Sequence, residues 1–319
     1  MIENAEQRTV SDLRTEATLP GGVVHKRAPE QVFVTDWMHG PGETMCTIAA
    51  RLPLAHARFS DGTTPYHDIV LVAETIRQAG LIITSQVFDI PAERQFLLRE
   101  LRVELDPLEL SRRAPESCEM TIWPDPASTV KMRRGGDLAG GMMMANCEIG
   151  GRRAATGQVV GAWVTDDAYV RLRDSQRILD APPAAAPLPV EDRELACGKR
   201  NPANSVLSPL RESGDGYAAT IVVDRDDPTW FDHPLDHVPG LLLLEAFQQA
   251  TVAAACARLG VTPDRVAVER FALRFSRIVE FSPDCACTIE LDERRGEAQV
   301  KSVQNDRSTS SGTFGFRVL

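Results

Sequence analysis

Two long apolar stretches stand out from the shorter segments around them. Residues 239–259 begin with Pro239-Gly240, carry leucine at four consecutive positions and are apolar on nearly every side. A helix with this pattern belongs inside a protein rather than on its surface. The stretch from Tyr66 to Val87 is similarly apolar, and it is longer than a typical buried strand. We therefore predict two buried helices.

Short apolar or alternating runs surround each helix, and they predict strands of antiparallel sheets. In the first half these runs are residues 31–35, 45–49, 95–105, 119–123, 129–133, 138–149 and 155–165. In the second half they are residues 217–224, 265–280, 286–292, 297–303 and 311–319. Strands and helices do not alternate as they would in a parallel sheet. The order of elements is instead the same in both halves.

An internal repeat explains this recurrence. An offset of 171 residues aligns Glu74-Thr-Ile-Arg-Gln-Ala79 with Glu245-Ala-Phe-Gln-Gln-Ala250, and it also places Arg94 on Arg265 and Arg99 on Arg270. Each half thus has one central helix followed by a long strand that carries arginines. One helix wrapped by an antiparallel sheet, present twice, predicts an α+β tandem double hotdog whose halves pack as a pseudo-dimer.

A proline- and alanine-rich segment, residues 181–189, separates the halves and is typical of a stiff linker. We predict four regions along the chain. They are a mobile lead-in (residues 1–22), an N-terminal hotdog domain (23–178), the linker (179–192) and a C-terminal hotdog domain (193–319).

Composition narrows the functional classes. The 319-residue chain has a net charge of −10, which argues against binding to nucleic acid or to anionic membranes. Its seven cysteines form no Cys-x-x-Cys pair, so we expect reduced thiols, no zinc site and a cytoplasmic location. The polar N-terminus does not resemble a signal peptide, and no uncharged run has the length of a membrane helix.

The two predicted helices carry polar residues that are costly to bury. Glu74 and Glu245 each lie four residues before a glutamine, Gln78 or Gln249, so each pair shares one helical face. Burying an unpaired carboxylate costs several kcal/mol of free energy or shifts the pKa of the group. We therefore interpret both glutamates as candidate catalytic residues; the alternative is that they form structural pairs with the glutamines or the main chain.

Histidines lie in the loop before each helix. His67 and Asp68 precede the first, while His233 and His237 precede the second. In paired hotdogs the loop before one helix faces the helix of the other half, which would pair His67 with Glu245, and His233 or His237 with Glu74. Alternatively, Asp68 caps the helix and the histidines bind main chain. We expect the remaining histidines, His25, His39 and His56, to be structural.

Several motifs resemble known families. Residues 231–251 resemble the active-site segment of β-hydroxyacyl-acyl carrier protein dehydratases. A wider set resembles the A-factor biosynthesis family, the tandem-hotdog γ-butyrolactone synthases of actinomycetes. This set comprises Val24-His-Lys-Arg27, Val34-Thr-Asp-Trp37, His67-Asp68 with residues 73–78, and residues 231–240 with Glu245-Ala246.

The second resemblance implies an acyltransferase. Such an enzyme moves a β-ketoacyl chain from an acidic acyl carrier protein to the hydroxyl of dihydroxyacetone phosphate, on the way to butyrolactone, butenolide or furan signals that regulate secondary metabolism. We expect no cofactor and no metal. Members often carry an arginine where this chain has Gln248.

This chemistry needs a base near the hydroxyl and donors for an oxyanion. Glu74 is our first candidate for the base, with a pKa raised by burial unless Arg77 or a histidine compensates. Helix-start N–H groups near Gly240 and Asp68 are candidates to polarise the thioester. Arg77 is the candidate for the phosphate. The further substrate-binding candidates are Gln78, Gln248 and Gln249.

Other interpretations stay open at this point. The arginines of residues 94–102 and 265–277 fit a solvated strand face or a docking surface for a carrier protein. The protein could instead be a hotdog thioesterase or dehydratase, or a non-catalytic acyl-ligand-binding protein. It could be a monomeric pseudo-dimer or a homodimer.

Overall fold

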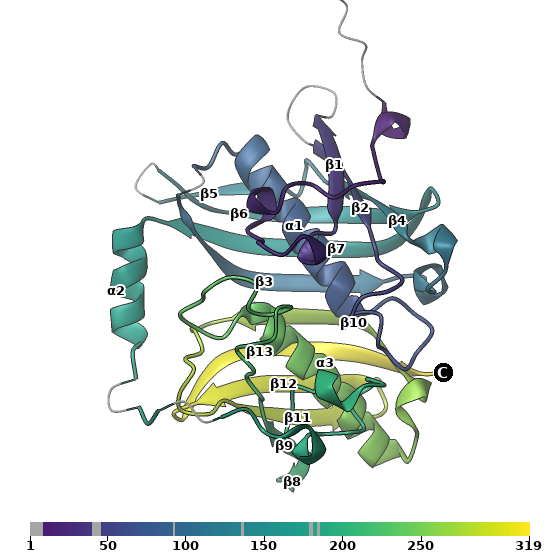
Figure 1. Ribbon diagram of the computed structural model, residues 1–319, viewed down its shortest axis with the longest axis vertical. Coiled ribbons are helices and arrows are strands. Elements are labelled where there is room, and N and C mark those ends of the chain that lie inside the picture. Colours follow the sequence, from purple (N-terminus) through teal and green to yellow (C-terminus); the bar gives the residue numbers. More distant parts are fainter. Residues whose placement is uncertain (1–8, 40–45, 92, 135–136, 179–180, 184–185) are drawn as a thin grey trace, which may run out of the picture.

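The computed structural model describes residues 9–39, 46–91, 93–134, 137–178, 181–183 and 186–319. Its strands run through two halves that lie one above the other in Figure 1. The first half contains β1 (Val34–His39), β2 (Cys46–Arg51), α1 (Ile69–Gln86), β3 (Gln95–Leu105), β4 (Glu119–Pro124), β5 (Val130–Arg134), β6 (Asp137–Ile149), β7 (Arg152–Val164) and α2 (Asp166–Gln176). The second contains β8 (Arg211–Ser213), β9 (Gly216–Thr220), α3 (Gly240–Leu259), β10 (Val266–Phe275), β11 (Ala286–Asp292), β12 (Glu297–Gln304) and β13 (Arg307–Val318).

The strands form one antiparallel sheet that crosses from half to half. Its order is β1-β2-β4-β6-β7-β3-β10-β13-β12-β11-β9-β8, and β5 pairs with β6. The junction is the antiparallel pair of β3 and β10, in register from Arg270 opposite Glu104 to Arg274 opposite Glu100. The predicted α+β tandem double hotdog with pseudo-dimeric packing is therefore confirmed.

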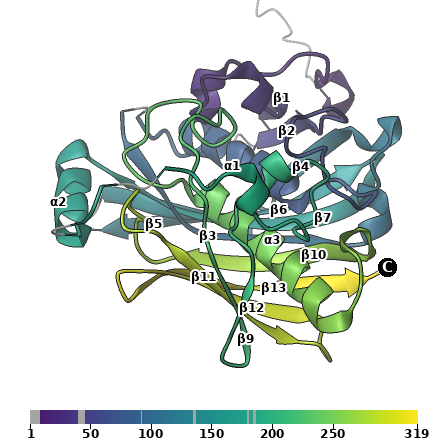
Figure 2. The same cartoon turned by 60° about the horizontal axis from the view of Figure 1, so that its bottom comes forward.

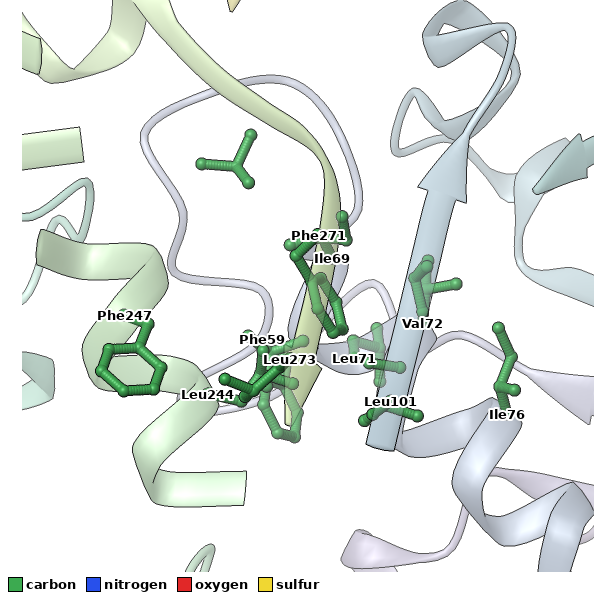
Figure 3. Close-up of a cluster of buried hydrophobic side chains, with 14 of the residues drawn as sticks. Phe59, Ile69, Leu71, Val72, Ile76, Leu101, Leu244, Phe247, Phe271 and Leu273 are labelled. Carbon is green, nitrogen blue, oxygen red and sulfur yellow. The ribbon is translucent and has the colours of Figure 1, made fainter. Parts of the chain in front are cut away.

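The two predicted buried helices, α1 and α3, lie on the same face of this sheet, as Figures 1 and 2 show. Side chains from both halves meet between the helices and the junction strands: Leu71 of α1, Leu101 of β3, Leu244 of α3 and Leu273 of β10 belong to one core (Figure 3). By length and composition alone α3 could cross a membrane, but 78% of its apolar window is buried inside the protein. Its apolar character thus serves the core.

Two parts of the chain differ from the expected arrangement. The described part of the predicted mobile lead-in, residues 9–22, lies against the first half: the N–H of Leu19 donates to the carbonyl of Val34 at 3.0 Å, and Leu19 packs on the core. The sequence pattern does not predict helix α2. This helix buries no residue, so its sequence has no apolar stripe that would indicate a helix.

Candidate active site

Two polar centres lie along the paired helices, one around Glu74 of α1 and one around Glu245 of α3. We refer to them as the first site and the second site. Each glutamate is buried, with 1% and 0% of its surface exposed. Because the repeat relates the two helices, the residues of one site have counterparts in the other. The two sites can therefore be compared residue by residue.

In the first site, Glu74 is held by groups from its own helix and by a preceding loop. Arg77 donates from Nε to Oε2 at 2.6 Å and from Nη2 to Oε1 at 2.8 Å. Gln78 donates to Oε1 at 2.9 Å, and Lys26 Nζ lies 3.7 Å from the same oxygen. Residues three and four positions along a helix face the same side, so α1 itself supplies two of these three partners.

These partners set the protonation state of Glu74. Burial alone would raise the pKa of this carboxyl, but Arg77 and Lys26, together with the hydrogen bonds from Arg77 and Gln78, lower it to about 2. The sequence predicts a raised pKa for Glu74 unless Arg77 or a histidine compensates for burial. Arg77 does compensate. Glu74 is therefore ionised at neutral pH and, with so low a pKa, a weak acceptor of protons.

Gln78 also anchors the segment that follows Lys26. Its Oε1 accepts from the N–H of Phe33 at 2.9 Å, and its Nε2 donates to the carbonyl of Gln31 at 2.7 Å. Gln249 does the same in the second half with Val206 at 2.9 Å and with Asn204 at 2.9 Å. Through these contacts both glutamines position neighbouring loops, and their predicted role in substrate binding stays a prediction.

A cavity of about 580 Å³ opens beside the first site. Both halves of the chain contribute to its wall. Its apolar lining includes Phe96, Leu97, Leu98, Leu172, Trp230, Leu235, Leu241, Leu243, Phe275 and Ile278. Its charged lining consists of Lys26, Arg27, Glu74, Arg77, Arg94, Arg99, Asp232 and Arg277. The cavity thus joins an apolar part with a strongly cationic part that contains six basic side chains and two carboxylates.

The loop before α3 brings His233 and His237 to the wall of this cavity, together with Glu74. His233 Nδ1 lies 2.7 Å from Asp232 Oδ1. The other oxygen of Asp232 accepts the N–H of Arg27 at 2.7 Å, which ties this loop to the segment around Lys26. The expected proximity of the His233 loop to α1 is present, while the catalytic roles of these histidines stay predictions.

Helix α2 fixes the far end of the same loop. His237 Nδ1 lies 2.6 Å from Asp236 Oδ1, which also accepts the hydroxyl of Tyr169 at 2.9 Å. Arg173 binds Asp236 and pairs with Glu280 at 2.6 Å. Sequence reasoning missed α2, although Thr165 is an N-cap and acidic residues fill the first turn, which is a helix-start signal.

The N-terminus of α3 also faces the cavity, through Pro239, Gly240 and Leu241. Pro239 is the N-cap and supplies no side-chain hydrogen bond. The first N–H groups of a helix have no partner inside it, and the helix dipole makes this end positive. This end of α3 therefore suits a developing oxyanion, as the sequence predicts for Gly240.

The second site contains a buried ion triad instead of an open cavity. Lys199 Nζ lies 2.8 Å from Glu245 Oε1 and 2.7 Å from Asp68 Oδ2. Gln249 donates to Glu245 Oε1 at 2.6 Å, whereas Glu245 Oε2 has no hydrogen-bond partner among the described residues. Burial and the Asp68 carboxylate raise the pKa of Glu245, against the opposing effect of Lys199.

Asp68 caps a helix and forms an ion pair in this structure, while its predicted role in substrate binding stays a prediction. Its Oδ1 caps α1 by accepting the N–H of Val70 at 2.9 Å, and its Oδ2 binds Lys199. The same cap occupies one of the helix-start donors that the sequence suggested for the thioester. The alternative interpretation of Asp68 as a helix cap is the one the geometry supports.

His67 also differs from its predicted place. Its Nε2 lies 2.9 Å from Ser117 Oγ, and Nδ1 has no hydrogen-bond partner among the described residues. No hydrogen bond joins it to Glu245 in the described part of the chain; its neighbour in the sequence, Asp68, contacts the same lysine, Lys199, as Glu245 does. Burial, with a contribution from Arg113, lowers the pKa of His67 to about 4, so its ring is neutral.

Gln248, the counterpart of Arg77 in the repeat, lines a small cavity of about 30 Å³ with His67 and Asp68. A space of that size holds about one water molecule. Glu245 is not part of its wall, and the amide oxygen of Gln248 has no partner among the described residues. Among the described residues, the second site thus has no cavity of substrate size beside its glutamate.

The lysines reveal a second part of the internal repeat. Lys26-Arg27 and Lys199-Arg200 are 173 residues apart, each followed by a proline, Pro29 or Pro202, that begins a short 3-10 helix. Lys26 and Lys199 both reach the glutamate of their own half. The paired Lys-Arg-x-Pro motif was the sequence signal for these two partners, and the 171-residue offset alone did not reveal it.

The comparisons with known proteins agree with this architecture. The A-factor biosynthesis hotdog domain family matches residues 8–165 and 181–319. The chain belongs to this family. A relative from Streptomyces coelicolor, named 2-oxo-3-(phosphooxy)propyl 3-oxoalkanoate synthase, is 31% identical over 95% of this chain and 91% of its own length. A relative of the same name from Streptomyces griseus is 32% identical over 86% of each chain.

Solved structures show the same fold at low sequence identity. The 12:0-ACP thioesterase from Umbellularia californica has a TM-score of 0.50 and 11% identity, over 86% of this chain and 98% of that one. A putative thioesterase II from Thermobifida fusca also has a TM-score of 0.50, with 13% identity over 89% of this chain and 96% of that one. Of the two glutamate sites, as far as the structure describes them, the first is the one beside a cavity of substrate size.

Proposed function

We propose that this family member is an acyltransferase that esterifies dihydroxyacetone phosphate with a 3-oxoacyl chain taken from a thioester on acyl carrier protein. The name of its relatives describes such a product, because a 2-oxo-3-(phosphooxy)propyl group is the residue of dihydroxyacetone phosphate. In this reaction the acceptor hydroxyl attacks the thioester carbon, its proton passes to a base, and the thiol leaves with a proton.

The observation that carries this proposal is the set of unpaired arginines in the first cavity. Lys26 and Arg77 are engaged with Glu74. Among the residues that the structure describes, the cavity-lining arginines Arg27, Arg94, Arg99 and Arg277 have no carboxylate partner. In a chain of net charge −10, such a cluster of free guanidinium groups favours a phosphate-bearing substrate.

The remainder of the cavity fits the other substrate. Its apolar wall, formed around Phe96, Leu241 and Phe275, suits an acyl chain. The start of α3 at Gly240 offers donors to the thioester oxygen. A single cavity thus contains room for a chain, donors for an oxyanion and cations for a phosphate, which is the set of parts that transfer to a phosphorylated alcohol requires.

The test is a reaction of the purified protein with a 3-oxoacyl thioester of acyl carrier protein and dihydroxyacetone phosphate. We expect a phosphorylated ester by mass spectrometry and thiol release that depends on the acceptor. Dihydroxyacetone without phosphate is the matched control and should react poorly. Thiol release at the same rate without any acceptor would identify a thioesterase, and no ester from any chain length would refute the proposal.

A further inference from the structure

The ionised Glu74 leaves the first site without an effective base, and the cavity wall contains another group for this task. We propose that His25 is the general base that removes the proton from the acceptor hydroxyl. The inference rests on the proposed function and assigns a catalytic residue to the same site. Sequence reasoning had placed His25 among the structural histidines.

The position of His25 is the first argument. It lines the 580 Å³ cavity together with Glu74, Arg77 and His233. Its ring has no hydrogen-bond partner among the described residues, unlike His233, whose Nδ1 lies 2.7 Å from Asp232. A lone-pair nitrogen that no protein group occupies is available to a substrate hydroxyl.

The backbone of His25 is the second argument. It has φ 56° and ψ 42°, a left-handed conformation that a residue with a side chain adopts at a conformational cost. The equivalent position of the second half, 173 residues later, is Gly198 with φ 82°. The turn itself therefore needs no side chain there. The half with the open cavity carries an imidazole at a position where the half with the closed site carries glycine.

The charge state of the ring is consistent with this role. Although His25 is an exposed residue, the protein around its ring desolvates it, and this effect, followed by Arg77 and His233, lowers the pKa of His25. The imidazole is therefore neutral at neutral pH and can accept a proton. The charged and titratable groups that face the same cavity come from every element around it: Glu74 and Arg77 from α1, Lys26 and Arg27 from the segment that follows His25, Arg94 just before β3 and Arg99 within it, Tyr169 from α2, Asp232, His233 and His237 from the loop before α3, and Arg277 after β10. In this arrangement the neutral imidazole of His25 accepts the proton, and the ionised carboxylate of Glu74 provides electrostatic support.

The proton balance is simple. As the acceptor oxygen attacks the thioester carbon, its proton moves to the ring nitrogen of His25 and a tetrahedral oxyanion forms at the start of α3. When the intermediate collapses, the carbon–sulfur bond breaks and the imidazolium returns the proton to the leaving thiolate. The ring ends the cycle neutral, and no further reactant is needed.

His25→Gly is a sharp test because the backbone already has a conformation that glycine prefers. We expect this variant to fold with an unchanged or higher melting temperature, while kcat for ester formation falls by about 10²-fold or more and KM changes little. Added imidazole should restore part of the rate in a saturable manner. The acid limb of the pH–rate profile should disappear. Asp89→Gly is the matched control, since Asp89 also has a positive φ of 53° but lies outside the cavity wall.

Two results would overturn the assignment. One is a His25→Gly variant with the wild-type kcat; the other is a slow variant that imidazole does not rescue and that retains the acid limb, which would indicate a structural role. NMR titration of the His25 ring in the wild-type protein does not depend on turnover, and a ring that stays protonated throughout the pH range of turnover would also refute the inference. An absence of ester from the wild-type protein would refute the proposed function instead.

Discussion

The two sites of this protein share the residues that hold the helices and loops together. They differ in the residues that can contact a substrate. Both have a buried glutamate on a central helix, a glutamine four residues later that fastens a neighbouring loop, and a lysine from a Lys-Arg-x-Pro segment. Only the first has a cavity large enough for a substrate among the described parts of the two sites.

The substitutions between the sites follow this difference. The repeat places Gly198 at the position of His25, Gln248 at that of Arg77, Gly62 at that of His233 and Asp106 at that of Arg277. In the other direction, Asp68 takes the position of Pro239, so the second site contains an additional carboxylate for its lysine. The shared glutamate, glutamine and lysine hold loops on helices, whereas the four replaced residues line the cavity of the first site. The cavity-lining Arg94 and Arg99 keep arginine counterparts, Arg265 and Arg270.

This pattern separates structure from chemistry within one chain. A duplicated fold needs its buried polar contacts in both halves, because unpaired buried groups destabilise either half equally. It needs the cavity-facing residues in one half only. The following experiments test that separation, in order of decreasing expected effect.

The largest effect on stability should come from the lysines. Lys199→Met leaves the carboxylates of Asp68 and Glu245 buried without their cation, and we expect a loss of about 3–5 kcal/mol in the free energy of unfolding. Lys26→Met should be much milder, because Glu74 retains its two hydrogen bonds from Arg77. Urea denaturation compares the two variants; equal losses would show that the first site depends on its lysine as the second does.

For turnover the order of the two sites should be reversed, with the larger loss caused by the substitution of Glu74 in the first site. Glu74→Gln removes the acceptor of Arg77 beside the cavity, and we expect kcat/KM to fall about 10²-fold, about 2.7 kcal/mol of transition-state stabilisation. Glu245→Gln should leave turnover near the wild-type rate because the second site is closed. Melting curves of both variants serve as folding controls, and a comparable loss from Glu245→Gln would mean that both sites participate.

A smaller effect is expected from the phosphate-facing arginines. Arg277→Ala should raise KM for dihydroxyacetone phosphate roughly ten- to hundredfold, because a hydrogen bond between charged groups contributes about 1.5–3 kcal/mol. Arg274→Ala is the matched control: Arg274 lies in β10, three residues before Arg277, but pairs with Glu100 and is 69% exposed. Similar KM values for the two variants would place the phosphate elsewhere.

The smallest effect is a difference in pH dependence. The folded-state pKa of Glu74 is lowered to about 2 from 4.5, so its contribution to stability is present above pH 4.5 and is lost as the pH falls toward 2. The pKa of Glu245 is raised, so its contribution is present below 4.5 and is lost as the pH rises through the folded-state value.

Unfolding free energies of the two glutamine variants at several pH values measure this contrast. Between pH 2 and 4.5, Glu74→Gln should flatten the slope by at most about 1.4 kcal/mol per pH unit, the limit for one proton. Glu245→Gln should change the slope with the opposite sign above pH 4.5. Changes of the same sign in the same range would contradict the difference between the two environments.

The sequence by itself determined the fold and much of the scaffold. Helices α1 and α3 were predictable because each is a long apolar run, and the 171-residue repeat identified Glu74 and Glu245 as equivalent buried carboxylates. The strands followed from local alternation. These features depend on neighbours within a few residues, where the periods of helix and strand decide which side chains share a face.

The tertiary structure decided the chemistry. Whether Glu74 acts as a base depends on Arg77 on its own helix, but also on Lys26, which is distant in sequence and comes near only after folding. The cavity beside it exists because β3 pairs with β10 and so brings the loop before α3 to α1. The pKa of a buried group is set by distances to charges and to solvent, and the chain order does not specify those distances. For that reason the two glutamates look equivalent in the sequence, and only the folded protein distinguishes an open site from a closed one.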